Sequence, residues 1–250
     1  MISCNKTGVL KVVLTLITTA MAFQVKSQNL PASDQIVTAA GNIELHFIGH
    51  GSLMFKMNNM IIYIDPVRSS GNYDNLPAGD IILVTHEHYD HLDTDLIDDL
   101  KKNGTVILCN GAAAAKIAGA KSMKPGDVQS IGNIIVEAVS AYNIVNERAP
   151  GQPFHPKGAG VGYIVNYGGK KIYVAGDTEN TPEMKSLKNI DIAFLPMNLP
   201  YTMTPQMVAD AAKAFKPKIL YPYHFGETNT ELIVNLLKDS GTEVRIRDLK

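Results

Sequence analysis

The sequence predicts an α/β fold built as a four-layer αββα sandwich. Apolar runs of strand length alternate with short helical segments, and the second half of the chain repeats the plan of the first. Two β-rich halves, each backed by helices, predict this layering, although periodicity alone does not fix it. The chain has 250 residues, of which 45% are apolar, and no linker divides it after residue 42, so we expect one domain over residues 43–250.

The first half is expected to contain short strands with two helices between them. The run Ile81–Val84 is continuously apolar, as in a strand covered on both faces, and Asn58-Asn59 suits a hairpin turn. Thr94 can cap a helix over Asp95–Leu100, which Gly104 can end. The expected strands span residues 44–48, 52–57, 60–64, 81–84, 105–109, 129–130 and 134–139, and a short Ala-rich helix spans 111–118.

The second half is expected to follow an irregular segment. Residues 142–158 are rich in Asn, Gly and Pro, a composition typical of a functional loop at the rim of a site. Thr204 with Pro205 opens a helix that Pro217 must end. A hairpin over 162–166 and 171–175 turns at Gly168-Gly169, and the remaining elements are strands 192–195 and 218–223 and a helix over 231–238.

The N-terminal segment is typical of an export signal. Lys6 and Lys11 precede an apolar run that is shorter than the ~20 residues of a membrane-spanning helix, and Ala20-Met21-Ala22 offers small residues to a signal peptidase. We expect residues 1–22 to be a signal peptide and 23–42 a flexible lead-in. The mature protein would then be periplasmic or secreted, without stable membrane insertion. An uncleaved amphipathic anchor is the alternative.

Charge and cysteine usage narrow the range of partners. The formal net charge is −1 and no stripe of Lys and Arg occurs, so nucleic-acid binding is not expected. Removal of Cys4 with the signal peptide would leave Cys109 alone, and we expect it to be a buried strand residue. The expected partner is a small-molecule substrate, and the oligomeric state stays open.

The densest group of potential metal ligands is the run His86-Glu87-His88-Tyr89-Asp90-His91. It lies directly between a buried strand and a capped helix, and it contains three of the seven histidines of the chain. Neutral imidazoles with a carboxylate at this density suit zinc or a similar transition metal. A solvated loop with accidental histidines is the alternative.

Two further residues end strands that could converge with this run. Asp177 follows the strand 171–175, and His224 follows the strand 218–223. Ligand sites in α/β sheets gather outside the carboxyl ends of strands, so a shared site is plausible. Taken singly, an Asp after a strand is more often a turn or helix cap, and a His is more often a hydrogen-bonded structural residue.

These motifs together resemble those of metallo-β-lactamase superfamily hydrolases. The chain is most similar to the branch that includes ascorbate-6-phosphate lactonase-like proteins and, more distantly, N-acylphosphatidylethanolamine phospholipase D-like enzymes. The resemblance runs from about Ile43 to about Gly226. It rests on Gly49-His50-Gly51-Ser52, Ile64-Asp65-Pro66, Thr85–His91, Ala175-Gly176-Asp177-Thr178 and Pro222-Tyr223-His224. It implies the metallo-β-lactamase fold, which has the αββα layering.

The resemblance also implies a ligand set for two metal ions. The implied ligands are His86 and His88 at the first metal, Asp90, His91 and His224 at the second, and Asp177 as the bridge. The family's third ligand to the first metal, usually a mid-chain His, has no match, because Ala141-Tyr142-Asn143 stands there. We expect His155 to reach back from the loop, with Asn143, water or no ligand as the alternatives.

Four other residues are candidates for supporting roles. His50 follows a strand and is expected at the rim, in contact with a ligand or the substrate, with a structural hydrogen bond as the alternative. Asp65 is a candidate to orient a metal ligand. Tyr201 and Met203 precede a helix and either line a pocket or serve in ordinary packing.

The ligand set predicts hydrolysis. Two Zn²⁺ ions, with Mn²⁺ or Fe as possible replacements, would lie about 3.5–4 Å apart and share a water of lowered pKa. A metal-bridging hydroxide would then attack an ester, lactone, amide or phosphodiester, with Asp90 as the catalytic residue that orients it and passes a proton to the leaving group.

Two other functions compete with hydrolysis. One is an iron-dependent oxidoreductase of the same superfamily, which the absence of a flavin-binding or rubredoxin-like module disfavours. The other is a noncatalytic metal-binding module, which the complete-looking ligand set disfavours. β-Lactam hydrolysis is not expected, because Gly176-Asp177-Thr178 resembles general hydrolases of the superfamily more than antibiotic-degrading ones.

Overall fold

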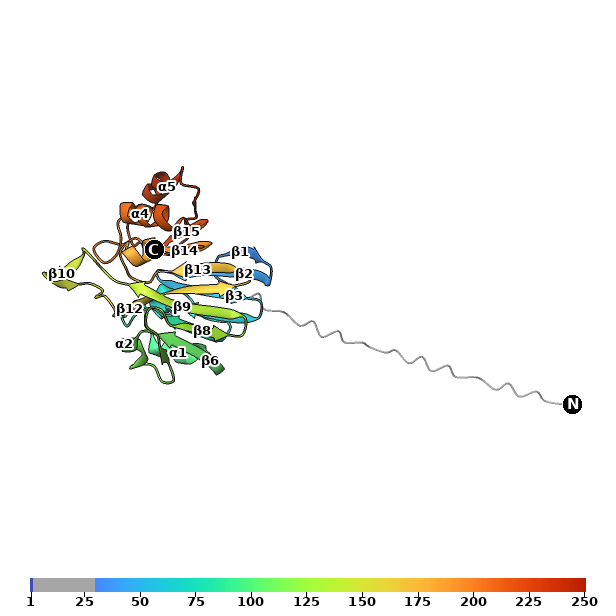
Figure 1. Ribbon diagram of the computed structural model, residues 1–250. Helices are drawn as coiled ribbons and strands as arrows, with labels where there is room; N and C mark the ends of the chain where they lie inside the picture. Colours follow the sequence, from blue (N-terminus) through green and yellow to red (C-terminus); the bar gives the residue numbers. More distant parts are fainter. Residues whose placement is uncertain (2–29) are drawn as a thin grey trace.

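The structure is a computed structural model that describes Met1 and residues 30–250. Two seven-stranded sheets lie face to face, with helices on the outer side of each (Figure 1). This arrangement confirms the predicted αββα sandwich. The expected signal peptide over residues 1–22 lies, apart from Met1, outside the described residues. No helix of residues 30–250 is long and apolar enough to cross a membrane.

The first sheet follows the order of the chain. Its first four strands are antiparallel, and its last four, from β4 onward, run parallel. The β3–β4 hairpin turns at Asn58, whose φ of 56° is a left-handed conformation that Asn tolerates better than most residues. The strands are β1 Ser33–Thr38, β2 Gly41–Gly49, β3 Ser52–Met57, β4 Met60–Ile64, β5 Gly79–Val84, β6 Lys101–Cys109 and β7 Lys121–Ser122.

The second sheet has the order β16-β15-β14-β13-β12-β9-β8. Its β13 to β16 half is parallel, and the remainder is antiparallel. Both sheets therefore combine a hairpin region with a parallel region, as the repeated plan of the sequence predicted. The strands are β8 Val128–Ile131, β9 Ile134–Ala141, β12 Gly160–Tyr167, β13 Lys170–Val174, β14 Ile192–Pro196, β15 Ile219–Tyr223 and β16 Glu243–Val244.

The outer layers are formed by short helices. Thr204 caps α4, as predicted, because its side chain accepts a hydrogen bond from the backbone N of Met207. The cap of α1 is Asp93 rather than the predicted Thr94, since the Asp93 carboxylate accepts from Leu96 N at 2.9 Å. The helices are α1 Thr94–Leu100, α2 Gly111–Ala114, α3 Pro182–Lys185, α4 Pro205–Phe215 and α5 Glu231–Leu237, with a 3₁₀ turn over Arg68–Ser70.

Two predicted segments differ in detail. The Ala-rich helix over 111–118 is shorter than expected, because α2 ends at Ala114. The irregular segment 142–158 contains a small two-stranded hairpin, formed by β10 Glu147–Ala149 and β11 Gln152–Pro153. Figure 1 shows this hairpin projecting from the body of the molecule.

The main core fills the space between the two sheets. Phe194 of β14 stacks on Tyr221 at a centroid distance of 4.8 Å and contacts Phe55 of β3 at 5.8 Å, which joins the second sheet to the first. A second cluster lies between the first sheet and the helices α1 and α2. Cys109 is buried there, as predicted, and burial raises the pKa of its thiol to about 11. The thiol is therefore protonated at neutral pH.

The described part of the lead-in is structured, so the prediction of flexibility is wrong for residues 33–38. These residues form β1, which pairs with β2 in register from Ser33 opposite His46 to Thr38 opposite Gly41. Asp34 accepts hydrogen bonds from the hydroxyl of Tyr221 at 2.6 Å, from Arg245 at 3.2 Å and from Arg247 at 2.6 Å. These partners are far away in the sequence, so no local pattern could indicate them.

We predict that Asp34→Asn destabilises the protein at neutral pH by about 1–3 kcal/mol, because it removes the ionised partner of Arg247. Burial opposes ionisation of Asp34, but hydrogen bonds from Arg247 and Tyr221 outweigh it and lower the pKa of the carboxyl below its ordinary 3.8. A lowered folded-state pKa means that this stability exists above pH 3.8 and is lost as the pH falls through the folded value.

Thermal or denaturant unfolding from pH 7 to pH 3 measures this effect. The difference between wild type and Asp34→Asn should shrink as the pH falls below about 4. Asp98→Asn is the matched control, because its carboxylate pairs with Lys101 on the exposed surface of α1. A difference that stays constant down to pH 3 would contradict the proposed ion pairing.

Candidate metal centre

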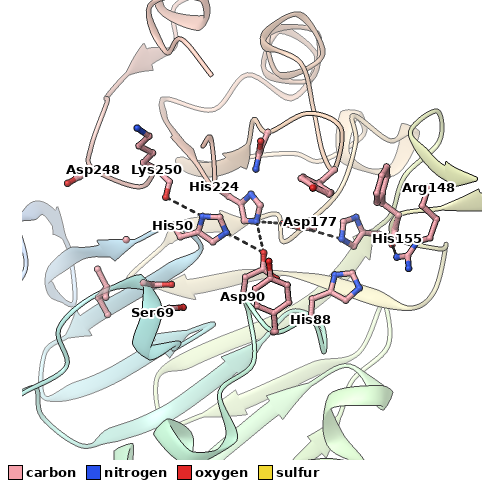
Figure 2. Close-up of a pocket in the computed structure, with 17 residues that line it drawn as sticks. His50, Ser69, His88, Asp90, Arg148, His155, Asp177, His224, Asp248 and Lys250 are labelled. Carbon is pink, nitrogen blue, oxygen red and sulfur yellow. Dashed lines mark hydrogen bonds and ion pairs between the residues drawn. The ribbon is translucent and has the colours of Figure 1, made fainter. Parts of the chain in front are cut away.

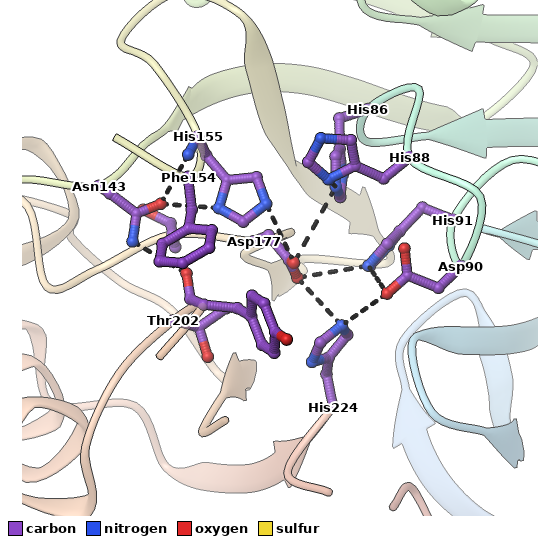
Figure 3. Close-up of polar contacts among 12 residues, drawn as sticks. His86, His88, Asp90, His91, Asn143, Phe154, His155, Asp177, Thr202 and His224 are labelled. Carbon is purple, nitrogen blue, oxygen red and sulfur yellow. Dashed lines mark hydrogen bonds and ion pairs between the residues drawn. The ribbon is translucent and has the colours of Figure 1, made fainter. Parts of the chain in front are cut away.

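The His86–His91 loop lies at the carboxyl end of β5, at one edge of the sandwich. Its backbone closes on itself, because His88 O accepts from His91 N at 3.0 Å and from Leu92 N at 2.9 Å. Asn110 donates to the Glu87 carboxylate at 2.7 Å and so ties the loop to the segment after β6. Asp177 follows β13 and His224 follows β15, and both lie at the same edge (Figure 3). The predicted convergence of strand ends is present.

One group of potential donors consists of His86, His88 and His155. Their donor nitrogens all lie within 4.8 Å of one another, and His86 Nε2 is 3.0 Å from His88 Nδ1. Asn143 lies behind His155, where its side-chain oxygen is 2.7 Å from the ring Nδ1 and accepts from the backbone N at 3.0 Å. The histidine, not the asparagine, therefore belongs to the donor group, and Asn143 holds it.

A second group consists of His50, Asp90, His91 and His224. Asp90 Oδ2 is 3.4 Å from His50 Nε2, 3.5 Å from His224 Nε2 and 3.9 Å from His91 Nε2. His50, expected at the rim, thus offers a ring nitrogen to this group. Its ring lies 3.8 Å from that of His224, and its Nδ1 lies 3.2 Å from the backbone oxygen of Lys250.

Asp177 lies between the two groups. Its Oδ1 is 3.4 Å from His91 Nε2 and 3.5 Å from His224 Nε2, while its Oδ2 is 3.3 Å from His155 Nε2 and 4.0 Å from His86 Nε2 (Figure 3). One carboxylate oxygen thus faces each group. This is the position of a residue that could bridge two ions.

Asp65, the candidate to orient a metal ligand, contacts His91. Its fully buried carboxylate lies 2.8 Å from His91 Nδ1 and accepts from Thr85 N at 2.7 Å and Thr85 Oγ1 at 2.6 Å. A donating Nδ1–H leaves the lone pair of Nε2 directed at the donor groups.

Two glycines of the quoted motifs are required by close contacts. A Cβ on Gly51 would lie 3.0 Å from Cε1 of His91, so a side chain there would push against the imidazole ring. Gly176 has a φ of 65°, and its Cβ would lie 3.0 Å from the backbone oxygen of Val161. Glycine at these places lets the β2–β3 turn approach the ring of His91, and lets the residue before Asp177 approach Val161 and Thr85.

The buried polar atoms of the cluster fit a cation. In residues 30–250, His91 Nε2, Asp177 Oδ1 and both ring nitrogens of His224 are buried without a hydrogen-bond partner. Buried polar atoms are normally hydrogen-bonded, and each unsatisfied one costs about 1–3 kcal/mol. An ion coordinated by His91 Nε2, Asp177 Oδ1 and His224 Nε2 would satisfy these three atoms but not His224 Nδ1. Imidazole with carboxylate is a donor set that transition metals accept.

The electrostatics of the cluster also favour a bound cation. Burial, reinforced by neighbouring histidines, lowers the pKa of His86 well below its usual range and that of His155 to about 4, so both rings are neutral donors at pH 7. At His91, burial acts in the same direction but is outweighed by Asp177 and Asp65, which raise the pKa well above its usual range. The carboxylates therefore attract positive charge to this position.

A cavity of about 780 Å³ opens onto the cluster (Figure 2). His50, His88, Asp90, His155, Asp177 and His224 all line it. Tyr201 also lines the cavity, whereas Met203 is fully buried in the main core, so the two candidates from the loop before α4 have different roles. A small-molecule substrate can therefore reach the donor atoms from solvent.

The model of the β-lactamase superfamily domain matches residues 44–224, which include every donor described above. The chain belongs to the β-lactamase superfamily. It is 28% identical over 218 residues to a UPF0173 metal-dependent hydrolase of Symbiobacterium thermophilum, a match that covers 82% of this chain and 92% of the relative. It is a metal-dependent hydrolase of this superfamily.

A solved structure supports the same assignment, and a second one shows the same fold. A candidate metal-dependent hydrolase from Parabacteroides distasonis is 47% identical, with a TM-score of 0.84, covering 88% of this chain and 99% of that one. CmlA, a diiron β-hydroxylase from Streptomyces venezuelae, is 15% identical with a TM-score of 0.64, covering 83% of this chain and 53% of that one. The second likeness shows the fold alone. The lactonase-like branch within the superfamily stays a prediction.

The sequence analysis missed Glu179, a residue that organises the loop beside the donor cluster. Glu179 is fully buried, and its carboxylate accepts from the backbone N atoms of Ile144 at 2.8 Å, Val145 at 2.7 Å and Asn146 at 2.7 Å, and from Asn143 Nδ2 at 3.2 Å. It therefore shapes the loop from which Asn143 holds His155. The only signal in the sequence was its place two residues after Asp177.

We predict that Glu179→Ala loosens the loop 143–146 and destabilises the protein by at least about 2 kcal/mol, because buried N–H groups lose their acceptor. Glu179→Gln should cause an intermediate loss, since its amide group presents a donor where the loop requires an acceptor. Hydrogen exchange of the amides of Ile144, Val145 and Asn146 reports the loosening directly.

The matched control is Glu147→Ala, in the exposed hairpin of the same segment, where the carboxylate accepts from Gly151 N. Its exchange rates at the loop 143–146 should equal those of wild type. Equal protection of the loop in Glu179→Ala and in this control would show that the buried carboxylate does not organise the loop.

Proposed function

We propose that this chain is an exported dinuclear zinc hydrolase that cleaves ester, lactone, amide or phosphodiester bonds of small molecules. Family membership supplies the broader activity, metal-dependent hydrolysis. The finer proposal is carried by Asp177, whose two carboxylate oxygens face two separate groups of donor atoms. A single-ion site would not need an acidic residue shared in this way.

The residues suit two ions. His86 Nε2, His88 Nδ1 and His155 Nε2 would hold the first, Asp90, His91 and His224 the second, and Asp177 both. His50 is an additional donor for the second. Zinc prefers this set of nitrogen and oxygen donors, and Mn²⁺ or Fe accepts it too. When bound, such ions supply a water of lowered pKa and stabilise negative charge on the substrate.

The chain's own residues would position the reactants. Asp90 lines the cavity with 27% of its side chain exposed, so its carboxylate can orient the attacking water, take its proton and pass it to the leaving group. Asp65 fixes the ring of His91, and Asn143 fixes that of His155, so the donors do not reorient during the reaction.

Export is proposed from the N-terminal sequence. Lys6 and Lys11, the apolar run after them and Ala20-Met21-Ala22 support a signal peptide over residues 1–22. Mature protein recovered from outside the cytoplasm should begin after Ala22.

The proposal predicts close to two transition-metal ions per chain after mild purification. Elemental analysis of the purified protein measures this, and a panel of lactones, phosphodiesters, acyl amides, esters and β-lactams measures hydrolysis. Zinc with hydrolysis of one non-β-lactam class is expected. Iron with oxygen consumption would replace the proposal with an oxidoreductase, and metal without turnover would indicate a noncatalytic module.

We predict that Asp90→Ala abolishes hydrolysis, with a loss of at least about 10²–10⁴-fold in kcat, because the proton carrier is removed. Asp98→Ala, on the exposed face of α1, is the matched control and should keep full activity. Metal content of both variants is measured beside kcat. An Asp90→Ala variant with wild-type kcat would remove this residue from the mechanism.

A further inference from the structure

The two ends of the cavity differ in chemistry. Figure 2 shows Arg148 beyond His155 on one side, and Lys250 with Asp248 beyond His50 on the other. Phe154 and Tyr201 accompany Arg148, whereas Ser69 and Ser70 line the cavity elsewhere. A substrate whose scissile bond lies at the donor cluster must therefore present a different group to each end.

The end near His155 has an aromatic wall formed by Phe154 and Tyr201. The rings of Phe154 and Tyr201 meet edge to face, with centroids 5.1 Å apart at 76°. Tyr201 keeps 46% of its surface exposed, and its backbone oxygen accepts from Asn143 Nδ2 at 2.9 Å. Because Asn143 also holds His155, the wall and the donor cluster share one support. An apolar or aromatic group bound here would lie beside the first donor group.

Arg148 adds a positive charge to this wall. Its Nη2 donates to the backbone oxygen of Phe154 at 3.0 Å, and its guanidinium carbon lies 5.8 Å from the Phe154 ring centroid. Within residues 30–250, no carboxylate oxygen lies within 4.0 Å of this guanidinium. Its other N–H donors are available, and a guanidinium binds carboxylate or phosphate oxygens in pairs.

The opposite end is a poorer place for an anion. The ammonium group of Lys250 is already paired with Glu227 at 2.7 Å. Asp248 also lines that end, and its carboxylate would repel a second negative charge. Among the cavity-lining residues of the described range 30–250, an unpaired cation and an apolar surface thus coincide at the Arg148 end alone.

We propose that Arg148, Phe154 and Tyr201 form a subsite for an anionic apolar group. The substrate then carries an aromatic or acyl moiety on one side of its scissile bond, and that moiety ends in an oxyanion, carboxylate or phosphate, that pairs with Arg148. This inference rests on the proposed hydrolase function and adds the substrate class to it.

Calorimetric binding to the metal-containing protein tests the subsite without requiring turnover. The probes are two matched pairs, benzoate with terephthalate and biphenyl monocarboxylate with the para,para′-dicarboxylate. One carboxylate of each probe can occupy the donor cluster, and only the dicarboxylates offer a second one to Arg148. At least one dicarboxylate should bind roughly tenfold more tightly than its monocarboxylate partner, the scale of one charged hydrogen bond.

The variants separate charge from apolar contact. Arg148→Met should remove the preference for the dicarboxylate, and Arg148→Lys should keep part of it. Tyr201→Ala should weaken the binding of both members of a pair equally, because it removes apolar surface and leaves the charge of Arg148 in place. Lys213→Met is the matched control, since this exposed lysine of α4 lies outside the cavity, and it should keep the full preference.

Two failures are distinguishable. A protein that holds metal and hydrolyses a substrate of the panel, but binds mono- and dicarboxylates equally, would overturn the subsite and leave the hydrolase proposal standing. An unchanged preference in Arg148→Met would overturn it as well. A purified protein without transition metal and without turnover would overturn the hydrolase proposal, and this inference with it.

Discussion

The buried carboxylate of Asp177 is the constraint on which the rest of the site depends. Its side chain is only 4% exposed, and a buried charge is costly unless opposite charges or donors surround it. The surroundings are imidazoles on both sides, brought from β5, β15 and the segment between β9 and β12. The two packed sheets bring those segments to one edge, so the site depends on the sandwich.

The inner histidines are held from behind in different ways. Asp65 contacts Nδ1 of His91, Asn143 contacts Nδ1 of His155, and the hydroxyl of Thr85 lies 3.1 Å from Nδ1 of His86. Each support leaves Nε2 of its ring facing the cluster. A carboxyl group supports His91, whereas a hydroxyl supports His86 and an amide supports His155. Of these three rings, His91 alone has a raised pKa, and those of His86 and His155 are lowered.

Local patterns in the sequence predicted much of the fold and of the candidate site. Contacts between residues far apart in the sequence could not be predicted in this way. The His86–His91 run could be recognised because four donors follow a buried strand within six residues, and Asp177 and His224 because each ends an apolar run. The tie between Asp34 and Arg247, and the loop that closes around Glu179, depend on partners more than 30 residues away. His50 looked peripheral for the same reason, since only the fold brings it to Asp90.

The segment after β9 has two parts with different roles, a part held against the donor cluster and a hairpin that projects from it. Glu179 and Asn143 fix its first residues and His155, while the hairpin β10–β11 between them projects into solvent and touches few other elements. Insertions, deletions or wholesale exchange of that hairpin would alter the mouth of the cavity without moving the donors. Selection can therefore act on the hairpin while the cluster of donor residues is inherited intact.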